Sequence, residues 1–314
     1  NPDQAQGGRY WNNYTWHGDQ DPSQPWWNGT QNCDVDLSDM RFTKLNTSWG
    51  KNFVENKMPE AHWKLESIER GARLVVITPE YNPTASRADY WIPVRPETDG
   101  TLFLGASKII LDENYQDIDF IKGFTDMPLL VRTDTLQYLD PFEVVKDYQL
   151  PDFSKSYSGR MQGLNQDQIR RLGGMMVWDL AKGKPVPLHR EQVGVHLAQS
   201  GIDPALTGTY RVKLLNGREI DAIPIYQLYQ IHLQDYDLDT VHQVNRAPKD
   251  LIVRWARDCG TVKPAAIHNG EGVCHYFHMT SMGRAAALVM MLTGNIGKFG
   301  TGCHTWSGNY KVGI

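Results

Sequence analysis

Three polar loops in the first hundred residues carry groups that suit a phosphorylated ligand. The first has a glycine, where a ligand can approach the backbone closely, and a lysine, whose cation suits a diphosphate. The other two offer carboxylates suited to ribose hydroxyls or guanine N–H groups. Taken singly, each loop is more typical of a polar connection, but the three together indicate a dinucleotide site. The loops are Gly50-Lys51-Asn52, Thr78-Pro79-Glu80-Tyr81 and Arg95-Pro96-Glu97-Thr98-Asp99.

The sequence lacks the patterns that mark several other kinds of site. The first loop lacks the second and third glycines of a nicotinamide-dinucleotide turn, and neither G-x-x-x-x-G-K-[ST] nor H-E-x-x-H occurs. Asp34, Asp36 and Asp39 hint at calcium, yet Leu45 stands where a calcium loop needs its last glutamate. The cysteines form no C-x-x-C pair, which argues against zinc and iron–sulfur sites and predicts buried free thiols. They are Cys33, Cys259, Cys274 and Cys303.

Alternating strands and helices must position the three loops. The apolar segment Leu45–Trp49 predicts a strand, and the pattern over 59–71 predicts a helix that ends at a glycine. The β-branched run Leu74–Ile77 follows, so the segment has the roughly 30-residue length of a β-α-β unit. A third strand at Tyr90–Val94 precedes a helix with Asp99 as its cap. This order favours a parallel sheet.

The second half of the chain starts with weak periodicity and then returns to the same alternation. An Asn216-Gly217 turn between two apolar runs predicts a β-hairpin over 210–223. A helix over 248–258 and a strand over 265–268 follow, and then a second glycine turn, Gly270-Glu271-Gly272. Apolar residues at helical spacing predict a further helix from Met279.

These patterns predict an α/β fold with dinucleotide-binding-like units on a parallel sheet and an inserted, less regular α+β segment. We expect four regions. They are a loop-rich segment at 1–44, a first α/β cofactor-binding unit at 45–139, an insertion or subdomain at 140–246 and a second α/β cofactor-binding unit at 247–314.

Composition narrows the classes of partner. The formal net charge is −4 and no dense run of lysine or arginine occurs, so no nucleic-acid partner is expected. The longest apolar run, 285–292, is too short to predict a membrane-spanning helix. The chain opens with Asn-Pro-Asp-Gln rather than methionine, which favours an internal piece of a longer protein.

Several motifs together resemble the nitrate reductase branch of the dimethyl sulfoxide reductase family. The resemblance covers nearly the whole chain. The sequence over 16–39 and 268–302 is most similar to that of nitrite-oxidising members. The motifs are, in order, Tyr14-Thr15-Trp16-His17-Gly18-Asp19, then Pro22, Pro25 and Trp26, then Trp49-Gly50-Lys51-Asn52, Thr78-Pro79-Glu80-Tyr81 and Thr98-Asp99.

The resemblance implies a molybdenum bis(molybdopterin guanine dinucleotide) cofactor, with Asp19 as a ligand to molybdenum. A carboxylate oxygen suits a high-valent metal, whereas the soft sulfur ligands come from the cofactor itself. The structural alternative is that Asp19 is a turn residue that binds no metal. Gly50, Lys51 and Asn52 would lie along one pterin diphosphate, with Glu80, Tyr81 and Asp99 nearer its nucleotide. The loop from Asn269 to His278, with Gly270 and Gly272 as cofactor-binding residues, would approach the molybdenum from the other side. His275 or His278 would bind substrate or move a proton.

The implied activity is oxidation of nitrite to nitrate, with the electrons passing to iron–sulfur clusters. The resemblance implies a 4Fe-4S cluster in the full-length subunit, bound outside this stretch, an iron–sulfur beta subunit and a haem or membrane-anchor subunit. It also implies a periplasmic, membrane-associated location, with the cytoplasmic face as the alternative. We expect this stretch alone to be inactive.

Two other functions remain open at this stage. Reduction of nitrate, selenate or chlorate would use the same cofactor, since the motifs indicate the cofactor before the substrate. In an unrelated class, the tryptophans of the first 30 residues would form a stacking platform for carbohydrate. Against that reading, β-α units follow those tryptophans, rather than the many short strands of a β-sandwich.

Overall fold

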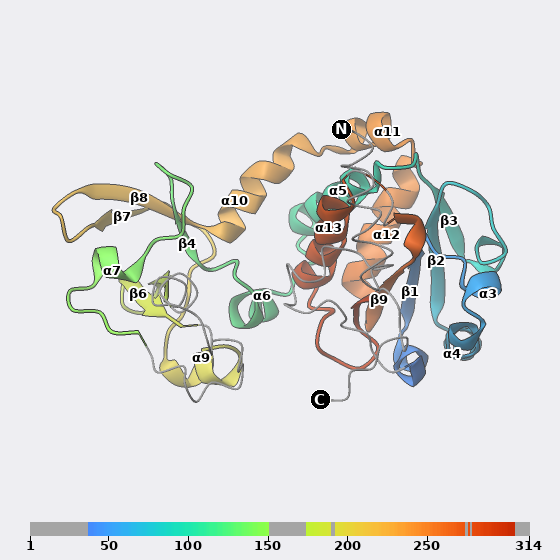
Figure 1. Cartoon of the computed structure of the whole chain (residues 1–314), viewed down its shortest axis with the longest axis horizontal. Helices are drawn as coiled ribbons and strands as arrows, with labels where there is room; N and C mark the ends of the chain where they lie inside the picture. The colour runs from blue at the N-terminus through green and yellow to red at the C-terminus, as the bar shows by residue number, and fades with distance from the viewer. Residues whose placement is uncertain (1–36, 151–173, 190–191, 274–275, 277, 305–314) are drawn as a thin grey trace, which may run out of the picture. The chain divides into compact units, whose positions relative to one another are not determined.

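The computed structural model describes residues 37–150, 174–189, 192–273, 276 and 278–304 (Figure 1). The chain divides into two compact units. One is formed by residues up to 117 together with those from 233 onward, and the other by residues 118–232. The elements of the first unit come from both ends of the sequence, as the blue and red ribbons of Figure 1 show.

A five-stranded parallel sheet, in the order β10-β9-β1-β2-β3, organises the first unit. The central strand pairs on both sides, and its last residue, Trp49, lies opposite Ile77 on one neighbour and Asn269 on the other. The loops after these three strands therefore leave the sheet at the same edge. The strands are β1 (Leu45–Trp49), β2 (Arg73–Thr78), β3 (Tyr90–Pro93), β9 (Ala265–Asn269) and β10 (Gly302–His304).

Helices cover both faces of this sheet (Figure 1). On one face lie α5 (Asp99–Asp112), α12 (Lys249–Thr261) and α13 (Met279–Leu292), and on the other lie α3 (Phe53–Asn56) and α4 (Met58–Glu69). This arrangement is expected of a parallel sheet, whose strands are buried on both sides. The other helical segments among the described residues of this unit are η1 (Leu37–Phe42), η2 (Ala85–Arg87), η5 (Leu233–Asp235), α11 (Leu238–Asn245) and η6 (Glu271–Val273).

Three buried aromatic rings fix the helices α5 and α12 onto strand β1. Phe103 meets Trp49 edge-on with ring centroids 4.6 Å apart, and Trp255 with centroids 5.5 Å apart. The indole of Trp255 also donates a hydrogen bond to the Thr47 hydroxyl, at 2.9 Å. The contacts combine apolar burial with a satisfied polar group, so they hold the end of β1 in one position.

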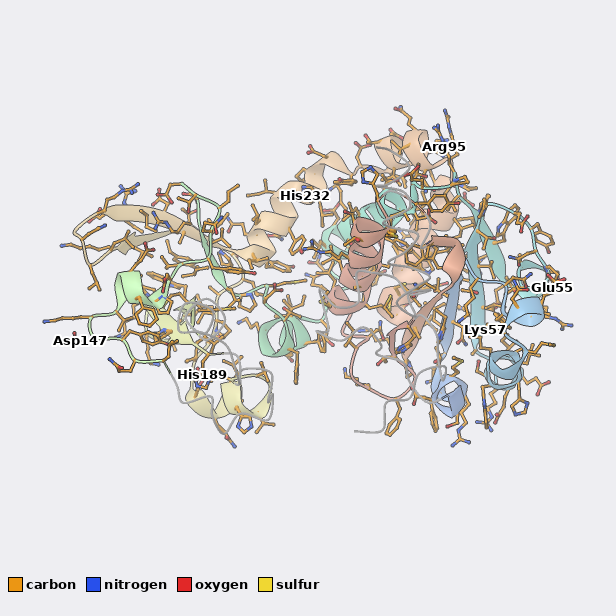
Figure 2. All side chains as sticks on the ribbon, viewed as in Figure 1. Glu55, Lys57, Arg95, Asp147, His189 and His232 are labelled. Atoms are coloured by element: carbon orange, nitrogen blue, oxygen red, sulfur yellow. The ribbon has the colours of Figure 1, made fainter. Side chains whose placement is uncertain are left out.

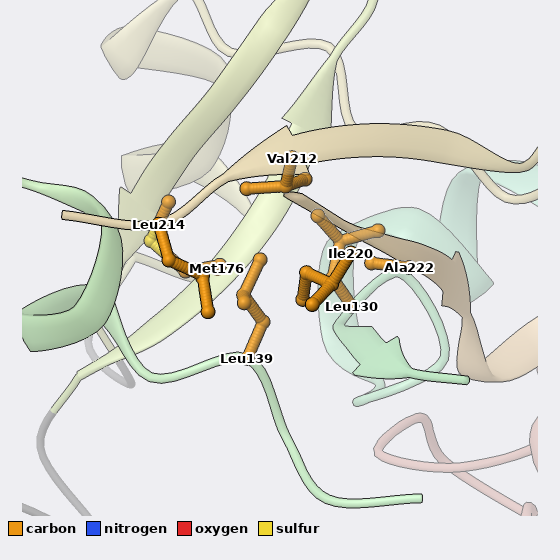
Figure 3. Packing of buried hydrophobic residues seen from close by; sticks show 7 residues of the cluster. All are labelled: Leu130, Leu139, Met176, Val212, Leu214, Ile220 and Ala222. Carbon is orange, nitrogen blue, oxygen red and sulfur yellow. The ribbon is translucent and has the colours of Figure 1, made fainter. Parts of the chain in front are cut away.

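The second unit has antiparallel strands. A three-stranded sheet has the order β4-β8-β7, and a separate hairpin joins β5 to β6. Seven buried side chains form its main core (Figure 3): Leu130, Leu139, Met176, Val212, Leu214, Ile220 and Ala222. The elements are α6 (Ile118–Phe124), β4 (Leu130–Arg132), α7 (Pro141–Val144), β5 (Met175–Asp179), β6 (Lys184–Leu188), α9 (Val195–Ser200), β7 (Tyr210–Lys213), β8 (Glu219–Pro224) and α10 (Ile225–His232).

The α/β class, the parallel sheet and the hairpin at Asn216-Gly217 agree with the sequence predictions. The second compact unit spans 118–232, whereas weakened periodicity placed an insertion at 140–246. One local prediction was wrong: Thr98 is the cap of α5 and Asp99 its first residue. Cys259 is a buried free thiol, as predicted, and Cys303 is buried as well. Within the described residues, no helix is both long and apolar enough to span a membrane.

Candidate functional site

A cavity of about 590 Å³ lies at the edge of the parallel sheet where β1, β2 and β9 end. Its walls combine the loops after these strands with the start of α5. Most of the cofactor-binding residues predicted from the sequence are here. They are Gly50, Lys51, Asn52, Thr78, Pro79, Glu80, Asp99, Gly270 and Gly272.

Two glycine turns meet backbone to backbone at the floor of the cavity. Gly50 has a positive φ of 56° and donates its N–H to the carbonyl of Ile77, at 2.9 Å. Gly270 donates to the carbonyl of Trp49, also at 2.9 Å. A Cβ on Gly270 would lie 2.5 Å from the Gly50 carbonyl oxygen, which is closer than packed atoms allow. Both positions therefore require glycine, which leaves backbone exposed to a ligand.

Lys51 supplies positive charge at this floor. The residue is 5% exposed and lines the cavity. Its carbonyl accepts a hydrogen bond from the Ser48 hydroxyl, at 2.9 Å, so the turn is tied to the end of β1. A second lysine, Lys57, lines the same cavity, and Figure 2 shows it on the side of the sheet that carries α3 and α4. A cavity with two lysines favours an anionic ligand.

Asp99 supplies a carboxylate on the opposite side. It is 3% exposed, and its Oδ1 accepts a hydrogen bond from the Trp49 indole at 2.8 Å. Burial raises the pKa of this carboxyl above its ordinary value, and the indole bond opposes that rise. Tyr276 lines the cavity as well, and its pKa is raised by burial and by the charges of Asp99 and Glu97. This wall presents acceptors for a ligand's N–H or O–H groups.

The loop after β2 is held by a hydrogen bond within the loop and by one from β3. The Thr78 hydroxyl donates to the Glu80 carbonyl at 2.7 Å, and the Trp91 indole donates to the Thr78 carbonyl at 3.0 Å. Glu80 lies at the cavity, but Tyr81 is 62% exposed and packs edge-on against Trp91. Tyr81 is therefore absent from the described lining.

Thr98 is also absent from the described lining and has a structural role. Its carbonyl accepts a hydrogen bond from the Asn245 side chain at 3.1 Å, which joins α11 to the start of α5. His278 is exposed, precedes α13 and is not among the described residues that line the cavity. Asp19 and His275 lie outside the described residues.

Sequence reasoning missed several cavity residues. Asn56 is the last residue of the short helix that follows the Gly50 turn, and Lys57 directly follows that helix. Their closeness to the turn along the chain was therefore a usable signal. Asn82 follows the second loop, and its carboxamide oxygen accepts the Ala85 N–H at 3.0 Å. The apolar members have no local signal, because only the fold brings them to the cavity. They are Ile77, Val94 and Val273.

Comparison with known protein families gives one match that covers almost the entire chain. The model of the molybdopterin oxidoreductase family matches residues 4–310. Among solved structures, acetylene hydratase from Pelobacter acetylenicus is similar at 14% identity and a TM-score of 0.45, covering 82% of this chain and 24% of that one.

Curated relatives match over most of this chain but over a minor part of their own length. The perchlorate reductase subunit alpha of Dechloromonas aromatica is 29% identical over 95% of this chain and 32% of its own. The respiratory nitrate reductase subunit alpha of Haloferax mediterranei is 30% identical over 95% and 29%, respectively. The chlorate reductase subunit alpha of Ideonella dechloratans is 27% identical over 87% and 27%. The chain thus spans about a third of these relatives.

Proposed function

Since the chain belongs to the molybdopterin oxidoreductase family, we propose that its cavity holds one dinucleotide arm of a molybdenum bis(molybdopterin guanine dinucleotide) cofactor. The observation that carries the proposal is the meeting of three strand ends at one cavity with a backbone floor, a buried lysine and a buried carboxylate. Loops at the carboxyl ends of parallel strands are the usual place for dinucleotides.

The residues present fit such a group. A volume of about 590 Å³ is in the range of cofactor pockets. The glycine floor admits a diphosphate next to the backbone, and Lys51 places a cation beside it. Asp99 accepts from the Trp49 indole through Oδ1. Its remaining lone pairs suit the N–H edge of guanine or a pair of ribose hydroxyls.

We propose oxidation of nitrite to nitrate as the reaction of the complete protein. When bound, the cofactor would supply oxygen-atom transfer, with water as the source of the oxygen and of two released protons, and would accept the two electrons. Asp19 is the proposed protein ligand to the metal. His275 and His278 are the proposed groups that orient nitrite and hold or release a proton at a ring nitrogen, because imidazole changes protonation near neutral pH.

The proposal includes partners and a location. The electrons would pass to a 4Fe-4S cluster bound outside this stretch, then to an iron–sulfur beta subunit and to a haem or membrane-anchor subunit. We propose a periplasmic, membrane-associated complex, with the cytoplasmic face as the alternative. The names of the relatives support the assignment as an alpha subunit.

A second candidate is reduction of an oxyanion, such as nitrate, perchlorate or chlorate. The support is that relatives across 87–95% of the chain bear the names of reductases for these three ions. The same cavity would serve either direction, because a dinucleotide-binding floor is independent of the substrate bound at the metal.

The test compares the complete complex with its Asp19→Ala variant, and with Asp21→Ala as a matched control two residues away. The measurements are molybdenum content, guanine nucleotide released per protein, the molybdenum electron paramagnetic resonance spectrum, and rates with nitrite and with nitrate, perchlorate and chlorate. We expect a changed spectrum and loss of activity in Asp19→Ala alone. Wild-type protein without molybdenum and guanine would contradict the cofactor assignment. Reduction without nitrite oxidation would favour the second candidate.

A further inference from the structure

His268, near the end of β9, is a buried imidazole whose hydrogen-bonding groups are unsatisfied. It is 1% exposed, and neither Nδ1 nor Nε2 has a hydrogen-bond partner. A neutral imidazole has one donor and one acceptor, and burying both without partners costs stability. Such a group in a native fold calls for an explanation in terms of function or of a bound species.

The position of His268 connects it to the floor of the cavity. In the sheet it lies opposite Ser48 of β1 on one side and His304 of β10 on the other. Its ring centroid is 5.5 Å from that of His304. Ser48 in turn donates its hydroxyl to the carbonyl of Lys51, at 2.9 Å. The imidazole thus sits beside the residue that anchors the Lys51 turn.

The charges that act on His268 are all basic within the described residues. Burial lowers its pKa well below the ordinary value, and the charges of Lys64, His304 and Lys51 lower it further. They come from α4, β10 and the turn after β1, respectively. Lys64 is fully buried, with its ammonium 4.6 Å from the Phe53 ring centroid. His268 is therefore neutral in a positive environment.

We propose that His268 takes up a proton from solvent when an anionic group occupies the cavity, so that occupancy of the cavity and protonation of this imidazole are thermodynamically linked. The inference rests on the proposed function for the identity of the anion, a diphosphate arm. Protonation adds one N–H donor and a positive charge, and both ring nitrogens become donors.

The sign of the linkage follows from electrostatics. A diphosphate beside Lys51 offsets the positive charge that disfavours imidazolium, so the pH at which His268 is half protonated rises on binding. For illustration, a unit charge ~10 Å away at an effective dielectric constant of ~20 would contribute on the order of one pH unit. By linkage the anion binds more tightly as pH falls, by about tenfold across the shifted range. At pH values above the His268 midpoints of both the free and the anion-bound protein, this linkage no longer changes the affinity for the anion.

Histidine C2 hydrogen–deuterium exchange, read by mass spectrometry across pH, tests the proposal in the full-length protein. The cofactor-loaded form is compared with the cofactor-free form from cells that cannot make the pterin. We expect the exchange midpoint of His268 to be higher in the loaded form by about one pH unit. The exposed His196 in the second unit serves as the internal control and should not change. Equal exchange of His268 in the two forms at every pH, including no detectable exchange in either, would overturn the proposal.

A variant supplies a second, independent measurement. Lys64→Met keeps the length and the apolar stem of a buried side chain but removes its charge, so the cofactor-free midpoint of His268 should rise. Lys108→Met, which removes a partly buried lysine paired with Asp112 on α5, is the matched control and should leave the midpoint of His268 unchanged. No rise in Lys64→Met would contradict the electrostatic basis. Metal and guanine analysis can show a loaded cofactor while the exchange midpoint of His268 is the same with and without it. In that case this inference fails and the proposed function stands.

Discussion

At the scale of single residues, the charge of Lys51 is the feature that most directly favours an anion. The side chain is almost fully buried at the cavity floor, where its charge is weakly screened. We predict that Lys51→Met lowers retention of the guanine dinucleotide about 10- to 100-fold, as expected for a lost charge-assisted hydrogen bond of about 1.5–3 kcal/mol. The measurement is nucleotide content after dialysis of the full-length protein.

Lys146→Met, an exposed lysine in the second unit, is the control for loss of one positive charge. If both variants retain as much nucleotide as the wild type, Lys51 does not contact the ligand.

Asp99 gives a prediction of pH dependence. Burial raises its pKa, so the folded state disfavours the carboxylate relative to the unfolded state. The contribution of Asp99 to the free energy of unfolding is therefore fully present below its unfolded-state pKa of 3.8. It is lost as the pH rises through the higher pKa of the folded state. Asp99→Asn keeps an acceptor for the Trp49 indole and carries no charge. We therefore expect this variant to be more stable than the wild type at pH 7 and to lose that advantage near pH 4.

The measurement for Asp99 is the free energy of unfolding of cofactor-free protein at both pH values, with nucleotide content of the loaded protein as a second readout. Asp112→Asn, at the other end of α5 and paired with Lys108, is the matched control. The compared quantity is the free energy of unfolding of Asp99→Asn minus that of the wild type. If this difference is lower at pH 7 than at pH 4, the carboxylate is favourable in the fold.

Residue types and spacing predicted that Gly50, Lys51 and Asp99 lie at one site, because a strand followed by such a loop is a local pattern, and all three line the cavity. Their roles toward a ligand stay predictions. They did not predict that Tyr81 is exposed and packs against Trp91, because this contact joins residues ten positions apart along the chain. Tyr276 was missed for the same reason. Its approach to Asp99 depends on the fold, not on neighbouring residues.

At the scale of elements, the contact between the turns after β1 and β9 is set by glycine. We predict that Gly270→Ala destabilises the fold by about 1–3 kcal/mol, because overpacking against backbone cannot be relieved by a rotamer change. Gly123→Ala is the control: the glycine lies in α6, and an added Cβ would have no neighbour closer than 3.9 Å. That variant should be neutral or slightly more stable.

The readouts are thermal unfolding of both variants and nucleotide content of the full-length protein. Gly270→Ala with wild-type stability and full nucleotide content would mean that the two turns can separate without cost.

Elements with a strong local pattern were predictable, and elements made by long-range pairing were not. The β-branched run in β2 and the Asn-Gly hairpin between β7 and β8 carry their own signals. β10 has only three residues and exists through its pairing with β9. The start of α5 was misplaced by one residue because threonine and aspartate are both good caps and stand side by side at 98 and 99.

At the scale of the whole molecule, each compact unit has an apolar cluster of its own among the residues that the structure describes. One cluster of the first unit consists of Phe53, Leu74, Val76 and Ala85. The cluster in Figure 3 belongs entirely to residues between 130 and 222. The periodicity of the sequence indicated a change of architecture in this region but not its bounds, because α6 and β4 are too short to carry a clear pattern.

Separate cores predict that damage to one unit stays local. Leu139→Ala should remove about 2–5 kcal/mol, since the side chain is fully buried. Hydrogen–deuterium exchange of backbone amides should then show lost protection within 118–232, while β1, β9 and the cavity loops remain protected and the nucleotide remains bound. Leu74→Ala, equally buried beneath α4, should give the reverse pattern and release the nucleotide. If Leu139→Ala exposes β1 and β9 to the same extent, the units unfold as one, and the second unit contributes to the stability of the cofactor site.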